Sequence, residues 1–147
     1  MERTHTEIAP AAPASFAANR ARGAVRLDVR VREGVTRRGD LHESGSLRVR
    51  FPSPEDDGLS AVFVNTAGGV AGGDRFDVEI AAHEGARLTL TTAAAEKIYR
   101  ATGKPAELDI TLKAAAGAHL SWLPQETILF DRSRVVRRIG IDLVEPS

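Results

Sequence analysis

Residues 75–90 read RFDVEIAAHEGARLTL, and residues 107–122 repeat the same pattern as ELDITLKAAAGAHLSW, so that Gly85 and Gly117 coincide at an offset of 32 residues. In both copies apolar and polar side chains alternate on either side of a Gly-Ala turn, which is the period of a half-buried strand. Two strand–turn–strand units of like sequence predict one shared core. Its expected members are Phe76, Val78, Ile80, Leu88 and Leu90 from the first copy and Leu108, Ile110, Leu112, Leu120 and Trp122 from the second.

Alternating segments continue on both sides of the repeat, as AVRLDVRV (24–31), LRVRF (47–51) and RIGIDL (138–143). Strand after strand at short spacing predicts an all-β fold. We expect a stacked, β-helix-like coil, in which each unit buries its apolar edge on the next. A β-sandwich of ordinary hairpins is the alternative. Residues 91–103 (TTAAAEKIYRATG) fit either a helix or a strand, because their alanines favour the first and their β-branched residues the second.

Two regions are expected along the chain. Residues 1–22 are rich in Ala and Pro without a period, which is typical of a mobile N-terminal tail. Residues 23–147 are expected to form one β domain, since this length can bury a single core.

Composition excludes several classes of protein. Lys plus Arg and Asp plus Glu number 20 each, so no global charge draws the chain to nucleic acid or to a membrane. No segment has the apolar length of a membrane span. Cysteine is absent, which excludes thiolate catalysis and cysteine metal sites in this chain and suits a cytoplasmic location.

The glycine-rich stretch NTAGGVAGGDRF (65–76) has the glycine spacing of a phosphate-binding loop at Gly68 and Gly73. A phosphate loop would continue with Lys and Ser or Thr, whereas Asp74 and Arg75 follow here. The stretch instead predicts a sharp turn between a strand ending near Asn65 and a strand beginning near Arg75, with Asp74 capping its own loop.

Signatures of catalysis are absent from the sequence. His83-Glu84 is not completed to a zinc-protease motif, because position 87 is Arg, and no serine stands in a nucleophile elbow. The sequence therefore gives no support to a zinc protease of this motif or to a serine hydrolase, and paired-carboxylate chemistry stays open.

Three long segments together carry a resemblance: NTAGGVAGGDRFDVEI (65–80), GARLTLTTAAAEKIYR (85–100) and GAHLSWLPQETILFD (117–131). In this order and spacing the chain resembles the urease accessory protein UreD, called UreH in some bacteria. The resemblance implies a β-helical fold and a non-enzymatic scaffold or chaperone role. Such proteins dock on the urease apoprotein and, with UreF and the GTPase UreG, help insert nickel. Members of the family are about twice as long, so the chain corresponds to the N-terminal part of that length.

The resemblance also marks residues. The motif positions are Gly68, Gly69, Gly72, Gly73, Thr91, Thr92, Lys97, Tyr99, Arg100, Trp122, Pro124 and Gln125. No firmly bound cofactor is expected. Nickel in transit needs oxygen or imidazole ligands that bind weakly enough to release it, and Asp74 and Glu126 are the acidic candidates for such a path. The alternative for each is structural: Asp74 caps a turn and Glu126 pairs with an arginine.

Two other functions stay open from the sequence. One is an unrelated β-rich ligand-binding module, which requires a concave apolar pocket near the glycine loop. The other is a β-helix enzyme with strand-borne carboxylates, which requires two acids converging in a cleft.

Overall fold

A computed structural model describes residues 19–52 and 58–144 of the chain. The named secondary-structure elements of these residues are all β-strands. None of the described residues forms a helix with the length and hydropathy needed to cross a bilayer. The strands are β1 (Arg22–Arg32), β2 (Val35–Gly45), β3 (Leu47–Arg50), β4 (Leu59–Asn65), β5 (Arg75–Ala82), β6 (Arg87–Thr92), β7 (Glu96–Ile98), β8 (Ala106–Ala114), β9 (His119–Leu123), β10 (Thr127–Leu129) and β11 (Val135–Leu143).

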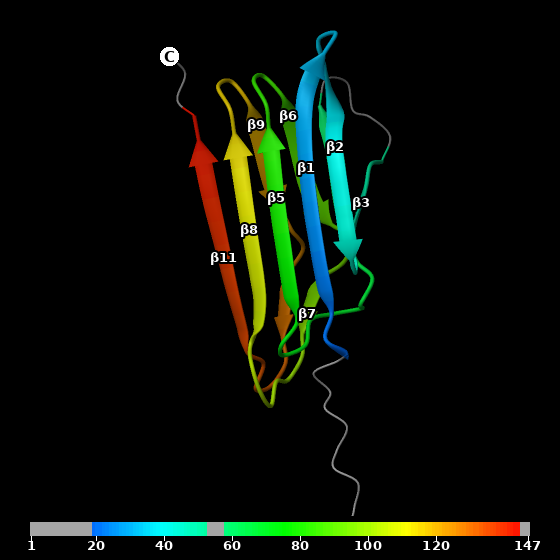
Figure 1. Ribbon diagram of the computed structural model, residues 1–147, viewed down its shortest axis with the longest axis vertical. Helices are drawn as coiled ribbons and strands as arrows, with labels where there is room; N and C mark the ends of the chain where they lie inside the picture. Colours follow the sequence, from blue (N-terminus) through cyan, green and yellow to red (C-terminus); the bar gives the residue numbers. More distant parts are fainter. Residues whose placement is uncertain (1–18, 53–57, 145–147) are drawn as a thin grey trace, which may run out of the picture.

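The strands form two facing sheets and one small sheet (Figure 1). The five-stranded sheet has the order β11-β8-β5-β1-β2, the four-stranded sheet β3-β4-β6-β9, and β10 pairs with β7. Neighbours are parallel except for β2, which is antiparallel to β1, and β3, which is antiparallel to β4. The expected all-β class is therefore confirmed.

The sequence repeat appears directly as strand pairing. β5 and β8 pair in parallel from Arg75 opposite Glu107 to Ala82 opposite Ala114, at the offset of 32 residues seen in the sequence. β6 and β9 pair at the same offset, with Leu90 opposite Trp122. Because paired residues of parallel strands face the same side of the sheet, each apolar position of one unit lies beside its counterpart in the next.

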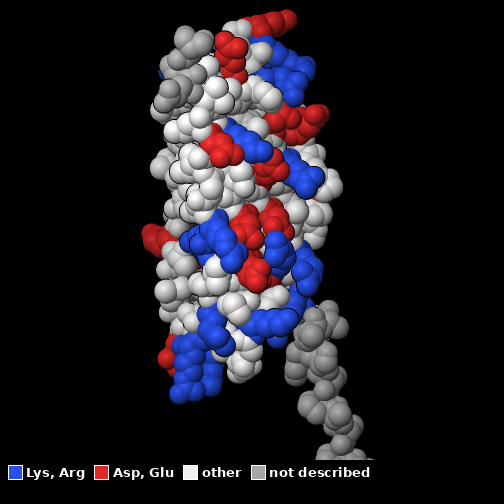
Figure 2. Space-filling model, turned by 60° about the vertical axis from the view of Figure 1, so that its left-hand side comes forward, with Lys and Arg blue, Asp and Glu red and all other residues white. Residues whose placement is uncertain are grey.

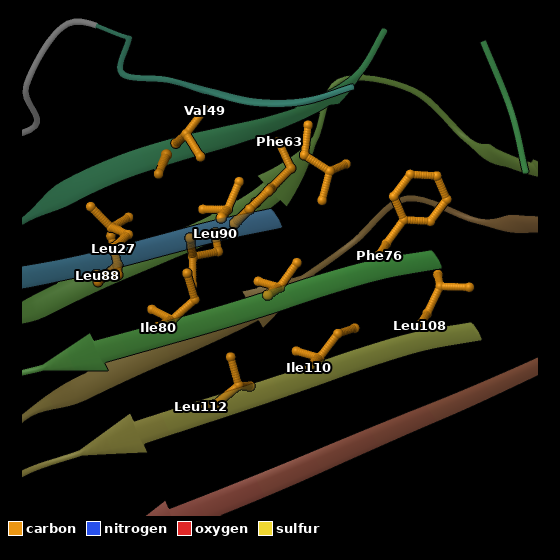
Figure 3. Close-up of a cluster of buried hydrophobic side chains, with 14 of the residues drawn as sticks. Leu27, Val49, Phe63, Phe76, Ile80, Leu88, Leu90, Leu108, Ile110 and Leu112 are labelled. Carbon is orange, nitrogen blue, oxygen red and sulfur yellow. The ribbon is translucent and has the colours of Figure 1, made fainter. Parts of the chain in front are cut away.

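The core lies between the two large sheets (Figure 3). The predicted shared core is confirmed: the five residues of the first copy are buried, as are Leu108, Ile110 and Leu112 of the second. Leu120 and Trp122 are only partly buried against it. The reason is their position on β9, which is the last strand of its sheet.

The structure also confirms one local prediction and decides between two alternatives for another segment. The glycine stretch connects β4, which ends at Asn65, to β5, which begins at Arg75, as predicted. Residues 91–103 take the extended alternative, because β6 ends at Thr92 and β7 covers Glu96–Ile98. The first strand begins at Arg22, and most of the expected tail lies outside the described residues.

The polar strand β2 was not anticipated by the alternation pattern. It pairs with β1 through a hairpin whose turn residues, Glu33 and Gly34, have φ of 52° and 77°. Two consecutive positive φ values match the twist that a tight hairpin requires. β2 therefore owes its conformation to this turn and to β1 rather than to an apolar face of its own.

One end of the strand stack is apolar and open. β11 and β9 are the last strands of their sheets, and β10 is the last strand of the small sheet. Large side chains on these strands are exposed, including Leu123 at 59%, Leu129 at 63%, Ile141 at 63% and Leu143 at 73%. Apolar surface of this kind on terminal strands is unfavourable in water.

Candidate functional site

Asp74 anchors the glycine loop from inside the protein. Its side chain is buried, with 4% of its surface exposed. Oδ1 accepts the Ala21 N–H at 2.8 Å, and Oδ2 accepts the Ala71 N–H at 2.7 Å. The Asp74 carbonyl also accepts the Glu107 N–H at 2.9 Å. One carboxylate thus ties together the segment before β1 and the turn before β5, and its backbone adds the segment that enters β8.

The glycine pairs are crowded by the next turn of the chain. A Cβ on Gly69 would lie 2.4 Å from the Tyr99 ring, and a Cβ on Gly72 would lie 2.6 Å from the Ala101 Cβ. The Tyr99 hydroxyl donates to the Gly68 carbonyl at 3.3 Å, and the Asn65 amide donates to the Gly69 carbonyl at 3.0 Å. The glycines therefore permit close packing of two loops, which agrees with the predicted tight turn.

Next to this loop an apolar cleft of about 470 Å³ opens between the sheets. The apolar side chains that line it include Phe63, Phe76 and Ile110 of the core and Trp122 at the edge of the core. Seven of the twelve motif residues line it: Gly68, Gly69, Thr92, Lys97, Trp122, Pro124 and Gln125. The fold thereby gathers all three motifs of the sequence around one cavity.

Glu96 and Arg137 form an ion pair in the lining of the cleft. Glu96 on β7 and Arg137 on β11 both line the cavity, and an Arg137 Nη2 donates to Glu96 Oε2. Arg137 also donates to the Thr127 hydroxyl at 3.2 Å. Burial raises the pKa of the Glu96 carboxyl above its usual value, and the charge of Arg137 opposes that rise. The pair closes the small sheet onto the five-stranded sheet.

The second and third motifs meet beside the same cleft. The Gln125 N–H donates to the Thr92 hydroxyl at 3.0 Å, which joins β6 to the segment after β9. Thr91 pairs with Leu123 in the sheet. Trp122 contacts Phe63 edge-on, with ring centroids 5.8 Å apart. These contacts give the motif residues a clear packing role.

The two acids proposed for nickel lie in different surroundings. Asp74 is buried with both oxygens bonded, whereas the Glu126 side chain is exposed, and neither is among the described residues that line the cleft. Over residues 19–52 and 58–144 no group of three or more His, Asp or Glu side chains is placed to hold a metal ion.

Glu96 and Arg137 were not singled out by sequence reasoning. Glu96 stood inside the recognised segment TTAAAEKIYR, but nothing local distinguishes it from a solvated glutamate. Its partner is 41 residues away, and only the stacking of β11 beside β8 brings the two together.

Comparison with known proteins gives the family. The model of the family described as UreD urease accessory protein matches residues 21–147. A urease accessory protein UreD of Bradyrhizobium diazoefficiens is 80% identical over 130 residues, which are 88% of this chain and 47% of that protein. UreD 3 of a Bradyrhizobium species is 77% identical over 135 residues (92% and 49%), and a UreD of Rhodopseudomonas palustris is 71% identical over 140 residues (95% and 50%). The chain thus spans about half the length of the curated relatives it matches. By this match, and by the motifs that surround one cleft, the chain belongs to the UreD urease accessory protein family.

Proposed function

We propose that the chain acts in the cytoplasm as a scaffold in urease maturation, helping nickel insertion into the urease apoprotein together with UreF and UreG. Family membership over residues 21–147 carries this proposal. The gathering of the three motifs around one cleft supports it, because residues of separate segments then form a single surface that a partner can contact.

The proposed role is non-catalytic. Among the described residues that line the cleft, Glu96 is the one acid, and it is paired with Arg137. The β-helix enzyme alternative requires two converging carboxylates, so this cleft gives it no support.

We also propose that the architecture is a stacked coil rather than a sandwich. Parallel pairing of β5 with β8 and of β6 with β9 at a single offset supports it, since a hairpin sandwich pairs neighbours antiparallel. The small pair of β7 with β10 adds a third side, with Thr127 opposite Glu96 at an offset of 127 − 96 = 31 residues. Each turn of the coil would then contribute one strand to each sheet.

Glu126 is the stronger of the two proposed nickel-path residues. Its carboxylate is exposed, and no ion pair joins it to another residue of the described chain. Asp74 already uses both oxygens for backbone N–H groups, which supports the anchoring alternative for that residue. Nickel would be cargo at Glu126, held by oxygen and released to the next site.

The nickel proposal is tested by the metal content of urease matured with wild-type protein and with the Glu126→Gln variant, at equal amounts of accessory protein. We expect less nickel per urease with the variant, because the amide is a weaker ligand. Glu84→Gln, another exposed acid in the turn between β5 and β6, is the matched control and is expected to match wild type. Equal nickel in all three samples would remove Glu126 from the path.

A ligand-binding module remains the second candidate, because the apolar pocket that it requires does lie beside Gly68 and Gly69. A bound small molecule would raise the melting temperature of the purified protein. Replacing Trp122 with Ala would abolish that rise if the ligand occupied the cleft. Failure of the protein to co-purify with urease, UreF or UreG would favour this candidate over the scaffold.

A further inference from the structure

Charged side chains on the outer face of the five-stranded sheet are largely paired with one another. Arg75 donates to Asp77, Glu107 and Asp109, and Lys113 donates to Glu79 at 2.7 Å. In Figure 2 blue and red side chains alternate over the middle of the molecule accordingly. Ion pairs of this kind between neighbouring strands favour their observed register. Because the opposite charges cancel, this face has little net charge with which to attract a partner.

The turns at the lower end of Figure 1 differ from this face. The segments 97–101 and 128–132 lie side by side, because the Phe130 N–H donates to the Ile98 carbonyl at 3.0 Å and the Ala101 N–H donates to the Arg132 carbonyl at 3.1 Å. We call their exposed side chains the basic turn surface. It consists of Lys97, Tyr99, Arg100, Ile128, Leu129, Phe130, Asp131 and Arg132, which are three cations, one acid and four apolar or aromatic side chains.

Two of the three cations of the basic turn surface, Lys97 and Arg100, have no ion-pair partner among residues 19–52 and 58–144. Arg132 reaches only Asp131, at 3.7 Å, and both side chains are more than two-thirds exposed, so this pair contributes little. Blue side chains gather at the lower end of Figure 2.

The same surface carries exposed apolar groups among its cations. Tyr99, Ile128 and Phe130 are 38%, 43% and 44% exposed. The rings of Tyr99 and Phe130 are in contact, with centroids 5.2 Å apart, and Ile128 stands opposite Lys97 in the sheet register. Aromatic side chains with neighbouring cations are the composition of protein-binding hot spots.

We propose that the basic turn surface docks an acidic protein surface that presents an apolar side chain to the Tyr99–Phe130 pair. This inference rests on the proposed function, because the partner is taken to be one of the urease-maturation proteins. The positive side chains attract an acidic surface, and the exposed apolar side chains beside them gain free energy when a partner's apolar side chain removes them from water. Single-stranded nucleic acid fits less well, since the surface has only three cations and the whole chain has a formal charge of zero.

The test measures the affinity of the full chain for purified UreF, UreG and urease apoprotein at about 50 mM and about 300 mM NaCl. The surface variant is Lys97→Glu with Arg100→Glu. The matched control is Arg32→Glu with Arg37→Glu, which makes the same charge change on exposed residues of the β1–β2 hairpin at the opposite end of the molecule. Circular dichroism melts confirm that both variants fold. A fluorescent single strand of about 20 nucleotides is the fourth probe.

We expect one of the three proteins to bind wild type more weakly at the higher salt, and to bind the surface variant about tenfold more weakly than the control. An Ile128→Ser variant, which keeps the charge, should also bind more weakly. Binding that the charge reversals leave unchanged would overturn the docking surface and leave the scaffold function standing. Failure of wild type to bind any of the three proteins would reject both proposals. Loss of affinity confined to the oligonucleotide would show that the surface serves nucleic acid instead.

Discussion

At the scale of single residues, Asp74 differs from an ordinary turn cap because both oxygens of its carboxylate are needed as hydrogen-bond acceptors. Asn usually caps about as well as Asp. Here, however, each carboxylate oxygen accepts a different backbone N–H inside the protein. An Asn side chain offers one acceptor oxygen and would turn its NH₂ group toward the second N–H.

Asp74→Asn should therefore lower the free energy of unfolding by about 1–3 kcal/mol, because one buried N–H loses its acceptor. Denaturant unfolding of the purified protein measures it. Asp131→Asn is the control, since the Asp131 side chain is 89% exposed, and it should be nearly silent. An Asp74→Asn protein as stable as wild type would show that the two bonds matter little. Any comparison of nickel delivery by this variant then requires equal amounts of folded protein.

Gly72 and Gly73 lend themselves to a similar test, for two different physical reasons. A Cβ on Gly72 would lie 2.7 Å from the Lys104 carbonyl oxygen, and Gly73 has a φ of +86°. Gly72→Val and Gly73→Val should each destabilise the protein by about 1–3 kcal/mol or abolish soluble expression. Gly103→Ala is the control, because its Cβ would meet nothing within 4 Å. Unchanged soluble yield with impaired urease activation would mean that the loop is functional surface instead.

At the scale of elements, the irregular pairing of β1 with β2 depends on one aspartate. The register passes from Leu27 opposite Leu41 to Val29 opposite Arg38, so β2 carries a bulge opposite Asp28. Asp28 Oδ2 accepts the Asp40 N–H of that bulge at 2.8 Å, and Oδ1 accepts from Arg30 at 2.6 Å. A Cβ at position 39 would lie 2.1 Å from Asp28 Oδ1, which explains the glycine there.

The bulge makes stability depend on pH. Burial alone would raise the pKa of Asp28, but the hydrogen bonds from Arg30 and Asp40 and the charge of Arg30 bring it below the usual value. A lowered folded-state pKa gives stability that is present above the unfolded-state pKa and is lost as the pH falls through the folded-state pKa. Asp28→Asn should thus cost about 1–2 kcal/mol at pH 7 and progressively less below about pH 4. Asp40→Asn, on the same bulge but exposed, is the control; a cost for Asp28→Asn that did not vary with pH would contradict the argument.

The elements also show what the sequence could and could not predict. The repeat predicted the pairing of Phe76 with Leu108 and of Leu90 with Trp122, because parallel stacking of like units keeps the sequence offset. β2 was not predicted, because its polar residues show no apolar–polar alternation. Its extended conformation is fixed by the turn that joins it to β1. The Glu96–Arg137 ion pair was not predicted either. These side chains are 41 residues apart in sequence, and they meet only because β11 takes its place beside β8 in the five-stranded sheet.

At the scale of the whole molecule, burial is uneven along the stack. Val25, Ile80, Leu88 and Leu90 are almost fully buried, whereas Ile139, Ile141 and Leu143 of β11 are 48%, 63% and 73% exposed. β11 is the last strand of its sheet and is nine residues long, so it presents a long apolar edge within the described chain. Edges of this kind pair with other chains unless something covers them.

A polypeptide of these 147 residues should therefore self-associate through β9 and β11 at micromolar concentration. Replacing Ile141 and Leu143 with Lys should shift it toward monomer, because two charges on the edge oppose strand pairing and remove apolar surface that is 63% and 73% exposed. Val31→Lys, at a 41% exposed position beside the β1–β2 turn, makes the same kind of change away from this edge and should leave association unchanged. Sedimentation velocity over a concentration series measures the difference. If the double variant and wild type sediment alike as monomers, the edge does not drive association and this prediction is wrong. If both associate alike, the contact lies elsewhere, and the exposed face of β9 is the next to test through Leu123→Lys.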